Sequence, residues 1–170
     1  QESDVEGCTN PNASNYDETA NVDDGSCCIE LWGECYNIEE TTSLNLTGMG
    51  LTGDVPTNIV NLINLTSLSL GNNQLTSLPQ NLGNLENLYF LDLGYNQITA
   101  IPNSITNLES LTYLWLFNNQ ITELPDNFCD LNLNWNDDDV NGYPYFAIGG
   151  NILCENVPDC VLNSENFNIS

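Results

Sequence analysis

Residues 137–148, DDDVNGYPYFAI, have the oxygen-bearing side chains and the spacing of a calcium-binding loop. The opening D-x-D-x-N-G pattern offers Asp137, Asp139 and Asn141 as oxygen ligands, with Gly142 at the sharp turn that such a loop requires. Ile148 stands where the bidentate glutamate of the pattern belongs. A calcium ion here would therefore be held more weakly, or by a different set of ligands, than in a complete loop.

Asp23 and Asp24, in the stretch VDDGSC, are the second candidate for Ca2+, with Asp17 or Asn21 nearby. Both acidic stretches are also typical of Asp-rich turns in solvent, because an Asp side chain bonds readily to the backbone two residues on. The sequence leaves both readings open, and Ca2+ is the cofactor that it suggests.

The chain lacks the side chains that many catalytic mechanisms require, because it contains no His, Lys or Arg. It therefore has no ordinary general base at neutral pH, no Ser–His or Cys–His pair and no Schiff-base lysine. Paired carboxylates for glycoside hydrolysis stay possible in principle, but Asp92 is the acid that falls on the expected sheet face. We expect no enzymatic activity.

The 24 acidic residues give the 170-residue chain a net charge of -24, with no basic side chain to offset it. Such a chain cannot neutralise phosphates, which excludes nucleic acid as a direct partner. Anionic membrane surfaces would also repel it. Its carboxylates must be solvated, hydrogen-bonded or bound to metal ions, since no salt bridge can form between its side chains.

Seven cysteines in a chain of this length are typical of an oxidising compartment. The sequence begins at Gln1 rather than Met, as expected of a mature chain whose signal peptide has been removed. No apolar run approaches the ~18 residues that insertion into a membrane needs. We expect a secreted protein, extracellular or displayed at the cell surface.

The candidate residues are positioned by an internal repeat with a period of 23 residues, in register at Leu65, Leu88 and Leu111. Apolar residues recur at the first, fourth, sixth, eleventh, fourteenth, eighteenth and twenty-first places, with Asn at the ninth and Pro at the fifteenth. The LxL pattern predicts a short strand with inward leucines, and stacked copies predict a parallel sheet. A buried Asn at each ninth place can satisfy backbone groups of adjacent turns.

These turns resemble the leucine-rich repeat family over residues 41–131, and LTGDVP at residues 51–56 is similar to the plant-type subclass. The resemblance implies an α/β-type solenoid: a short leucine-rich repeat stack with a parallel β-sheet on its concave face, an irregular convex side and disulfide-stabilised caps. The first turn is a longer variant, with Met49 in the ninth place.

The N-terminal region divides into two parts. Residues 1–27 resemble a short, acidic, cysteine-bounded module of secreted proteins from environmental bacteria, and residues 28–40 fit an N-terminal cap. The disulfides implied are Cys8–Cys27 and Cys28–Cys35.

A C-terminal cap is expected at residues 132–161. GNILCENVPDC at residues 150–160 resembles the plant-type cap in which the two cysteines bond to each other, which implies Cys154–Cys160. Cys129 is then left, either as a buried free thiol or in an intermolecular or rearranged bond.

Four places in each turn, the third, fifth, seventh and eighth, are exposed on the sheet face. Along the solenoid they change from small and polar to aromatic, and aromatic anchors are concentrated in interfaces. The expected interaction face consists of Phe90, Asp92, Tyr95, Tyr113, Trp115 and Phe117.

Two arrangements are compatible with this face. The segment between Cys129 and Cys154 could fold back over it as an extended cap, using aromatics of its own. Alternatively, the face binds something outside the chain. The aromatics of the segment are Trp135, Tyr143, Tyr145 and Phe146.

Two functions follow. The first is a self-assembling subunit of an extracellular filament or surface layer, a homo-oligomer or polymer stabilised by calcium. In it, the alternating Phe167 and Ile169 of the tail at residues 162–170 could add a strand to a sheet edge. The alternative is an adhesion or ligand-binding module whose aromatic face holds a protein or a glycan.

Overall fold

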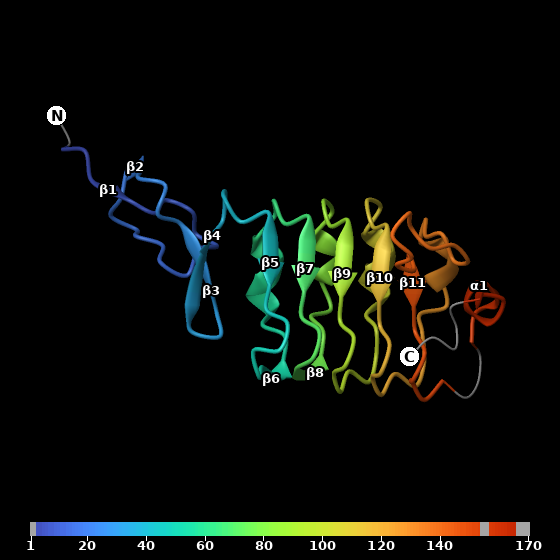
Figure 1. Cartoon of the computed structure of the whole chain (residues 1–170). Coiled ribbons are helices and arrows are strands. Elements are labelled where there is room, and N and C mark those ends of the chain that lie inside the picture. Colours follow the sequence, from blue (N-terminus) through green and yellow to red (C-terminus); the bar gives the residue numbers. More distant parts are fainter. Residues whose placement is uncertain (1–2, 154–156, 166–170) are drawn as a thin grey trace.

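Each turn of the repeat adds one strand to a parallel sheet, and the stacked turns form an elongated solenoid (Figure 1). The computed structural model describes residues 3–153 and 157–165. The sheet has five strands in the order β11-β10-β9-β7-β5. Their bounds are β5 Ser43–Asn45, β7 Ser67–Ser69, β9 Phe90–Asp92, β10 Tyr113–Trp115 and β11 Phe146–Ala147.

The central residues of the strands form one buried row across the sheet. Leu68 is in register with Leu44 on one side and Leu91 on the other, and the row continues to Leu114 and Phe146. All five side chains are buried, and each contributes roughly 1.5–3 kcal/mol by leaving water. The solenoid fold expected from the leucine pattern is confirmed.

The opposite side of each turn is irregular and carries short 3-10 helices. Pro56 and Pro102 stand directly before two of them in extended backbone, which the fixed φ of proline favours. The helices are η1 Thr57–Asn61, η2 Leu82–Asn84, η3 Asn103–Asn107 and η4 Phe128–Asp130. Strands β6 Thr52–Asp54 and β8 Gln74–Ser77 form a second, two-stranded parallel sheet along one edge of the solenoid (Figure 1).

Buried asparagines at the ninth place join successive turns, as the sequence predicts. Asn96 Nδ2 donates to the Leu70 carbonyl of the preceding turn (3.0 Å) and to the Leu93 carbonyl of its own turn (3.1 Å). Its Oδ1 atom accepts the Leu75 N–H (3.0 Å). These bonds satisfy backbone groups that would otherwise be buried without a partner. The same ladder includes Asn73 and Asn119.

Residues 143–151, YPYFAIGGN, form a fifth turn in a region that the sequence pattern assigned to the cap. Asn151 makes the ladder contacts there: Nδ2 donates to the Leu116 and Ile148 carbonyls (2.9 and 2.7 Å), and Oδ1 accepts the Ile121 N–H (3.0 Å). The turn lies off the period, because Phe146 comes 32 residues after Leu114, its partner in the sheet. Phe and Ile also replace the two leucines.

Two small sheets precede the solenoid. Strand β1 Glu6–Gly7 pairs in parallel with β2 Val22–Asp23. Strand β3 Cys28–Leu31 forms an antiparallel hairpin with β4 Glu34–Asn37, and the hairpin turn places Trp32 and Gly33 at positive φ (49° and 87°). Ile29 and Leu31 of the hairpin are buried and close the N-terminal end of the leucine core.

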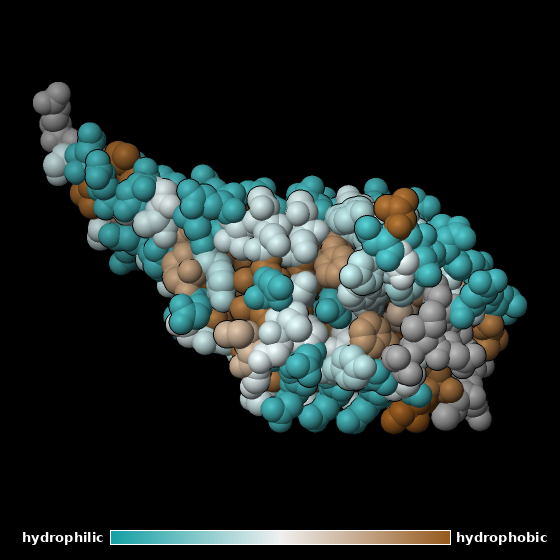
Figure 2. Space-filling view, in the orientation of Figure 1, coloured by the Kyte–Doolittle hydropathy of each residue, from teal (hydrophilic) through white to brown (hydrophobic). Residues whose placement is uncertain are grey.

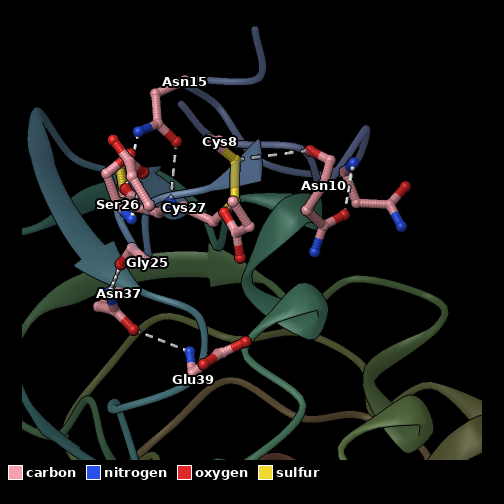
Figure 3. Close-up of a disulfide and its surroundings, with 12 residues drawn as sticks. Cys8, Asn10, Asn15, Gly25, Ser26, Cys27, Asn37 and Glu39 are labelled. Carbon is pink, nitrogen blue, oxygen red and sulfur yellow. Dashed lines mark hydrogen bonds between the residues drawn. A yellow bond between two sulfur atoms is a disulfide. The ribbon is translucent and has the colours of Figure 1, made fainter. Parts of the chain in front are cut away.

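The disulfides Cys8–Cys27 and Cys28–Cys35 are present as expected. Figure 3 shows the first of them with the amide side chains around it. Asn15 Nδ2 donates to the Ser26 carbonyl (2.7 Å), and Asn15 Oδ1 accepts the Cys28 N–H (2.9 Å). Asn37 Nδ2 donates to the Gly25 carbonyl (2.8 Å). These bonds fix the acidic N-terminal segment against the hairpin.

The third disulfide corrects the expected pairing, because Cys160 bonds to Cys129 and not to Cys154. Cys129 lies on η4, and Cys160 lies on the short helix α1 Asp159–Leu162. Their Cα atoms are 5.7 Å apart, an ordinary disulfide separation. The chain returns to η4 only after the unexpected fifth turn, and that return brings the two cysteines together. Cys154 lies outside the described residues.

Phe167 and Ile169, whose alternation suggested an added strand, lie outside the described residues. Within the described ranges, no helix has the length and apolar character needed to cross a bilayer.

Candidate binding face on the parallel sheet

The parallel sheet carries a connected set of aromatic rings on its outward face. Register places Phe90 beside Tyr113 and Asp92 beside Trp115. Phe90 packs edge-on against Trp115 with ring centroids 5.0 Å apart, and the Trp115 and Phe117 centroids are 6.3 Å apart. Figure 2 shows this side of the molecule, where pale and tan atoms over the strands lie between hydrophilic margins. The six residues of the predicted face do lie on one side of the sheet.

The chain's own loop at residues 137–145 covers part of this face. Tyr113 Oη donates to Asp139 Oδ2 (3.0 Å), and Trp115 Nε1 donates to the Pro144 carbonyl (2.7 Å). Tyr145 stacks against Tyr113 at 4.9 Å, and Tyr143 lies 6.1 Å from Trp115. Of the two arrangements left open by the sequence, covering by the chain's own segment is therefore present at Tyr113 and Trp115, through Tyr143 and Tyr145.

Trp135 and Phe146, the other two aromatics of that arrangement, do not cover the face. They pack against each other at 4.9 Å and against Phe128, forming an aromatic cluster at the C-terminal end of the core. Phe146 is fully buried because it occupies the inward place of the fifth turn. The sequence pattern could have revealed this place through the spacing of Phe146, Ile148 and Asn151.

The open part of the face consists of Phe90, Asp92, Tyr95 and Phe117, beside the partly buried Trp115. Tyr95 is 54% exposed and stands at positive φ (54°), where Gly or Asn is usual. Its ring packs edge-on against Phe117 at 5.3 Å. A large side chain kept in a costly backbone conformation and left in solvent is a mark of a functional surface.

Two glycines let side chains of the next turn lie flat on the sheet. A Cβ atom on Gly94 would come within 2.6 Å of Phe117 Cζ, and one on Gly71 within 2.7 Å of Asp92 Oδ2. The Asp92 carboxylate therefore rests over Gly71, just after β7, and the Phe117 ring rests over Gly94, just after β9. The repeat pattern predicts exposed seventh places at Gly71 and Gly94, but it does not predict that side chains of the next turn pack over them.

Two acids at the face, Asp92 and Asp139, have pKa values that their surroundings shift in opposite directions. Burial raises the pKa of Asp92, and the Gly94 N–H, which donates to Oδ1 at 2.9 Å, opposes that rise. The N–H groups of Tyr143 and Asn141 lower the pKa of Asp139. Desolvation raises the pKa of Tyr113 above its ordinary value, so its hydroxyl stays protonated and donates to Asp139.

The calcium candidates make protein contacts of their own. Asp139 Oδ1 accepts the N–H groups of Asn141 (2.8 Å) and Tyr143 (3.0 Å), and Asp137 Oδ2 accepts from Asn134 Nδ2 (2.9 Å). Residues 3–153 and 157–165 contain no group of three or more His, Cys, Asp or Glu placed to hold a metal ion. Calcium at Asp137, Asp139 and Asn141, or at Asp23 and Asp24, stays a prediction.

A polar hollow of about 520 Å³ lies on the irregular side of the solenoid. Its lining offers hydrogen-bonding groups but no aromatic anchor, which makes it a weaker candidate for a specific partner than the sheet face. The lining residues are Glu86, Asn87, Thr106, Asn107, Glu109 and Ser110.

Comparison with known proteins agrees with the geometry. A family model described as a leucine-rich repeat region matches residues 33–133. A search of curated proteins finds no match.

Several solved structures resemble the fold. The BIR2 ectodomain from Arabidopsis thaliana has 26% identity and a TM-score of 0.52, over 65% of this chain and 68% of that one. A leucine-rich repeat protein of Leptospira interrogans has 30% identity and a TM-score of 0.52, over 73% and 35%. The plant peptide hormone receptor RGFR1, solved in complex with RGF2, has 25% identity and a TM-score of 0.57, over 74% and 23%. The chain thus spans about a third or less of the last two.

Proposed function

This chain belongs to the leucine-rich repeat family, and on that basis we propose that it is a non-catalytic extracellular module that binds a partner on its sheet face. The observation that carries the proposal is the set of open aromatic rings on and just after the strands: Phe90 on β9, Tyr95 after β9 and Phe117 after β10. Residues there contribute nothing to the leucine core, so their size is explained by contact with another molecule. The partner class is a protein or a glycan.

Two further observations support binding. RGFR1, a relative of similar fold, is a peptide hormone receptor solved with RGF2. The loop at residues 137–145 holds Tyr113 and Trp115 by hydrogen bonds, so part of the face is rigid before a partner arrives. Rigid anchors lose less conformational entropy on binding. Three disulfides also suit an extracellular location.

The proposal is tested by screening the chain against a glycan array and a displayed peptide library. Ligands of the face should lose at least about tenfold in affinity with Phe117→Ala, as hot-spot aromatics do. Met49→Ala is the matched control, because Met49 is also exposed (66%) but follows β5, which β7 separates from β9 and β10 in the sheet. Ligands that bind both variants equally would contradict the proposal.

Self-assembly into a filament or surface layer is the less supported reading. The relatives named above are described as an ectodomain, a repeat protein and a hormone receptor, none as a filament subunit. Analytical ultracentrifugation with and without Ca2+ separates the two. A monomer at high protein concentration in both conditions would exclude a polymer.

A further inference from the structure

Asp92 is the acid at the centre of the open face. It stands on β9 with Ser69 of β7 on one side and Trp115 of β10 on the other. The other outward places of the sheet strands carry Ser, Asn, Ala or aromatic residues. Asp92 is therefore the charged side chain that the sheet strands themselves place on this face, whereas Asp139 reaches it from the loop and is bonded to Tyr113.

The surroundings of this carboxylate are shaped by its neighbours. It lies over Gly71 on the side of β7, where the glycine leaves room for it. On the side of β10 it is bordered by Trp115, which packs against Phe90 and Phe117 (centroids 5.0 and 6.3 Å apart). The result is an anionic point beside aromatic rings, open toward solvent.

The carboxylate is incompletely satisfied within the chain. Gly94 N–H donates to Oδ1 at 2.9 Å, and in the part of the chain that the structure describes no donor reaches Oδ2. The whole sequence contains no Lys, Arg or His that could pair with it. Half-burying a charge without an opposite charge is costly, and a cation supplied by another molecule would relieve that cost.

We infer that the ligand of this face presents a guanidinium or ammonium group, the side chain of a basic peptide or protein, which seats against Asp92 beside the rings of Phe90, Trp115 and Phe117. Two interactions would stabilise a cation there: a charge-assisted hydrogen bond to the carboxylate and attraction to the faces of the rings. The inference rests on the proposed function, since it names the chemistry of the partner for the same face.

Charge favours a basic peptide over a neutral glycan. A net charge of -24 with no positive side chain attracts cationic partners from a distance and repels anionic ones. A neutral sugar would gain nothing from that field. A neutral sugar that covered the neighbouring rings would also leave the Asp92 charge without an opposite charge.

The test uses the full chain and three probes: a capped tripeptide with a central arginine, the same peptide with citrulline, and cellohexaose. Citrulline keeps the shape of arginine but lacks its charge. Binding is followed by NMR through the Gly94 amide, which is bonded to Asp92, and the Trp115 indole N–H, which is bonded to the Pro144 carbonyl. The arginine peptide should shift both signals, and the citrulline peptide should bind about tenfold more weakly.

A pair of variants isolates the site from the general negative charge. Asp92→Asn keeps an oxygen for the Gly94 N–H and should weaken the arginine peptide about tenfold. Glu86→Gln removes the same charge from an exposed position on the opposite side and should leave the affinity unchanged.

The outcomes separate this inference from the proposed function. Equal binding of the citrulline and arginine peptides, or equal weakening by both variants, would overturn the cationic ligand while leaving the face a binding site. Binding of cellohexaose in place of the arginine peptide would do the same and identify a glycan site. If no probe shifts the two signals at millimolar concentration, the cationic inference is overturned, and the Phe117→Ala test above still decides the binding function.

Discussion

Asp92 is a residue whose burial works against the stability of the folded chain. Burial raises its pKa above the value in the unfolded chain. The folded state therefore binds the proton more tightly, and the free energy of unfolding falls as pH rises through the folded pKa. The folded chain therefore keeps a charge on the candidate face at a cost in stability, a pattern common at functional sites.

Replacing this charge should stabilise the protein at neutral pH. We expect Asp92→Asn to raise Tm at pH 7 by about 2–4 °C, the effect of ~1 kcal/mol in a domain of this size. The difference should shrink as pH falls through the raised pKa of the folded state and vanish below the ordinary Asp pKa, because Asp92 is then protonated in both states. Thermal melts of both proteins across this pH range measure it. Glu86→Gln, at an exposed position, controls for the loss of one negative charge. A Tm difference that does not change with pH would contradict the assignment.

Single residues of the face were predictable where the repeat fixes their place. The 23-residue period puts Phe90, Asp92 and Phe117 on outward positions, because side chains alternate across a strand. The period says nothing of the bond between Tyr113 and Asp139, since Asp139 lies in a loop outside the repeat. That contact depends on the path of the chain after the fourth turn and required the structure.

At the scale of elements, the asparagine ladder holds neighbouring turns in register. We expect Asn96→Ala to lower the free energy of unfolding by about 2–4 kcal/mol, because it leaves several buried backbone groups unpaired at once. Chemical unfolding in urea measures the change. Asn84→Ala is the matched control, because Asn84 is exposed at the end of η2 and should cost far less. Equal effects of the two changes would contradict the role of the ladder.

The loop at residues 137–145 depends on one indole. Trp115→Phe keeps an aromatic ring but removes the 2.7 Å bond to the Pro144 carbonyl. We expect faster hydrogen exchange at the Asp139 and Tyr145 amides, which are bonded within this loop, and a loss of about 1 kcal/mol in stability. Exchange at Leu91, in the middle of the sheet, serves as the internal reference and should change little. Unchanged exchange in the loop would show that β11 alone fixes it.

The elements that the sequence failed to predict share one cause. The fifth turn and the Cys129–Cys160 bond both follow a stretch of the chain that departs from the period. The spacing of Phe146, Ile148 and Asn151 matches that of the repeat, but the turn does not follow after 23 residues and lacks the two leucines, so the period alone does not locate it. The cysteine pairing then followed the resemblance to the plant-type cap, whereas the real partner of Cys160 is set by where α1 packs.

At the scale of the whole molecule, the missing cations leave self-repulsion unopposed. If the acidic stretches bind calcium, Ca2+ should raise Tm more than NaCl or Mg2+ at the same ionic strength, since screening alone does not distinguish the ions. Asp137→Asn should remove part of the calcium-specific rise, and Asp126→Asn, at another exposed acid, should not. Differential scanning fluorimetry measures these shifts. Equal effects of the three salts would leave the acids as solvated turn residues.

The glycines beneath the face also determine how such a surface can be passed on. Asp92 rests on Gly71 and Phe117 rests on Gly94, so each of these side chains depends on a residue of the turn before it. A gene rearrangement that copied one turn alone would separate the Phe117 ring from the glycine that leaves room for it. These four residues stand on three consecutive turns, so the smallest unit that carries both contacts is three adjacent turns, and descendants of this chain that gain repeats should keep them together.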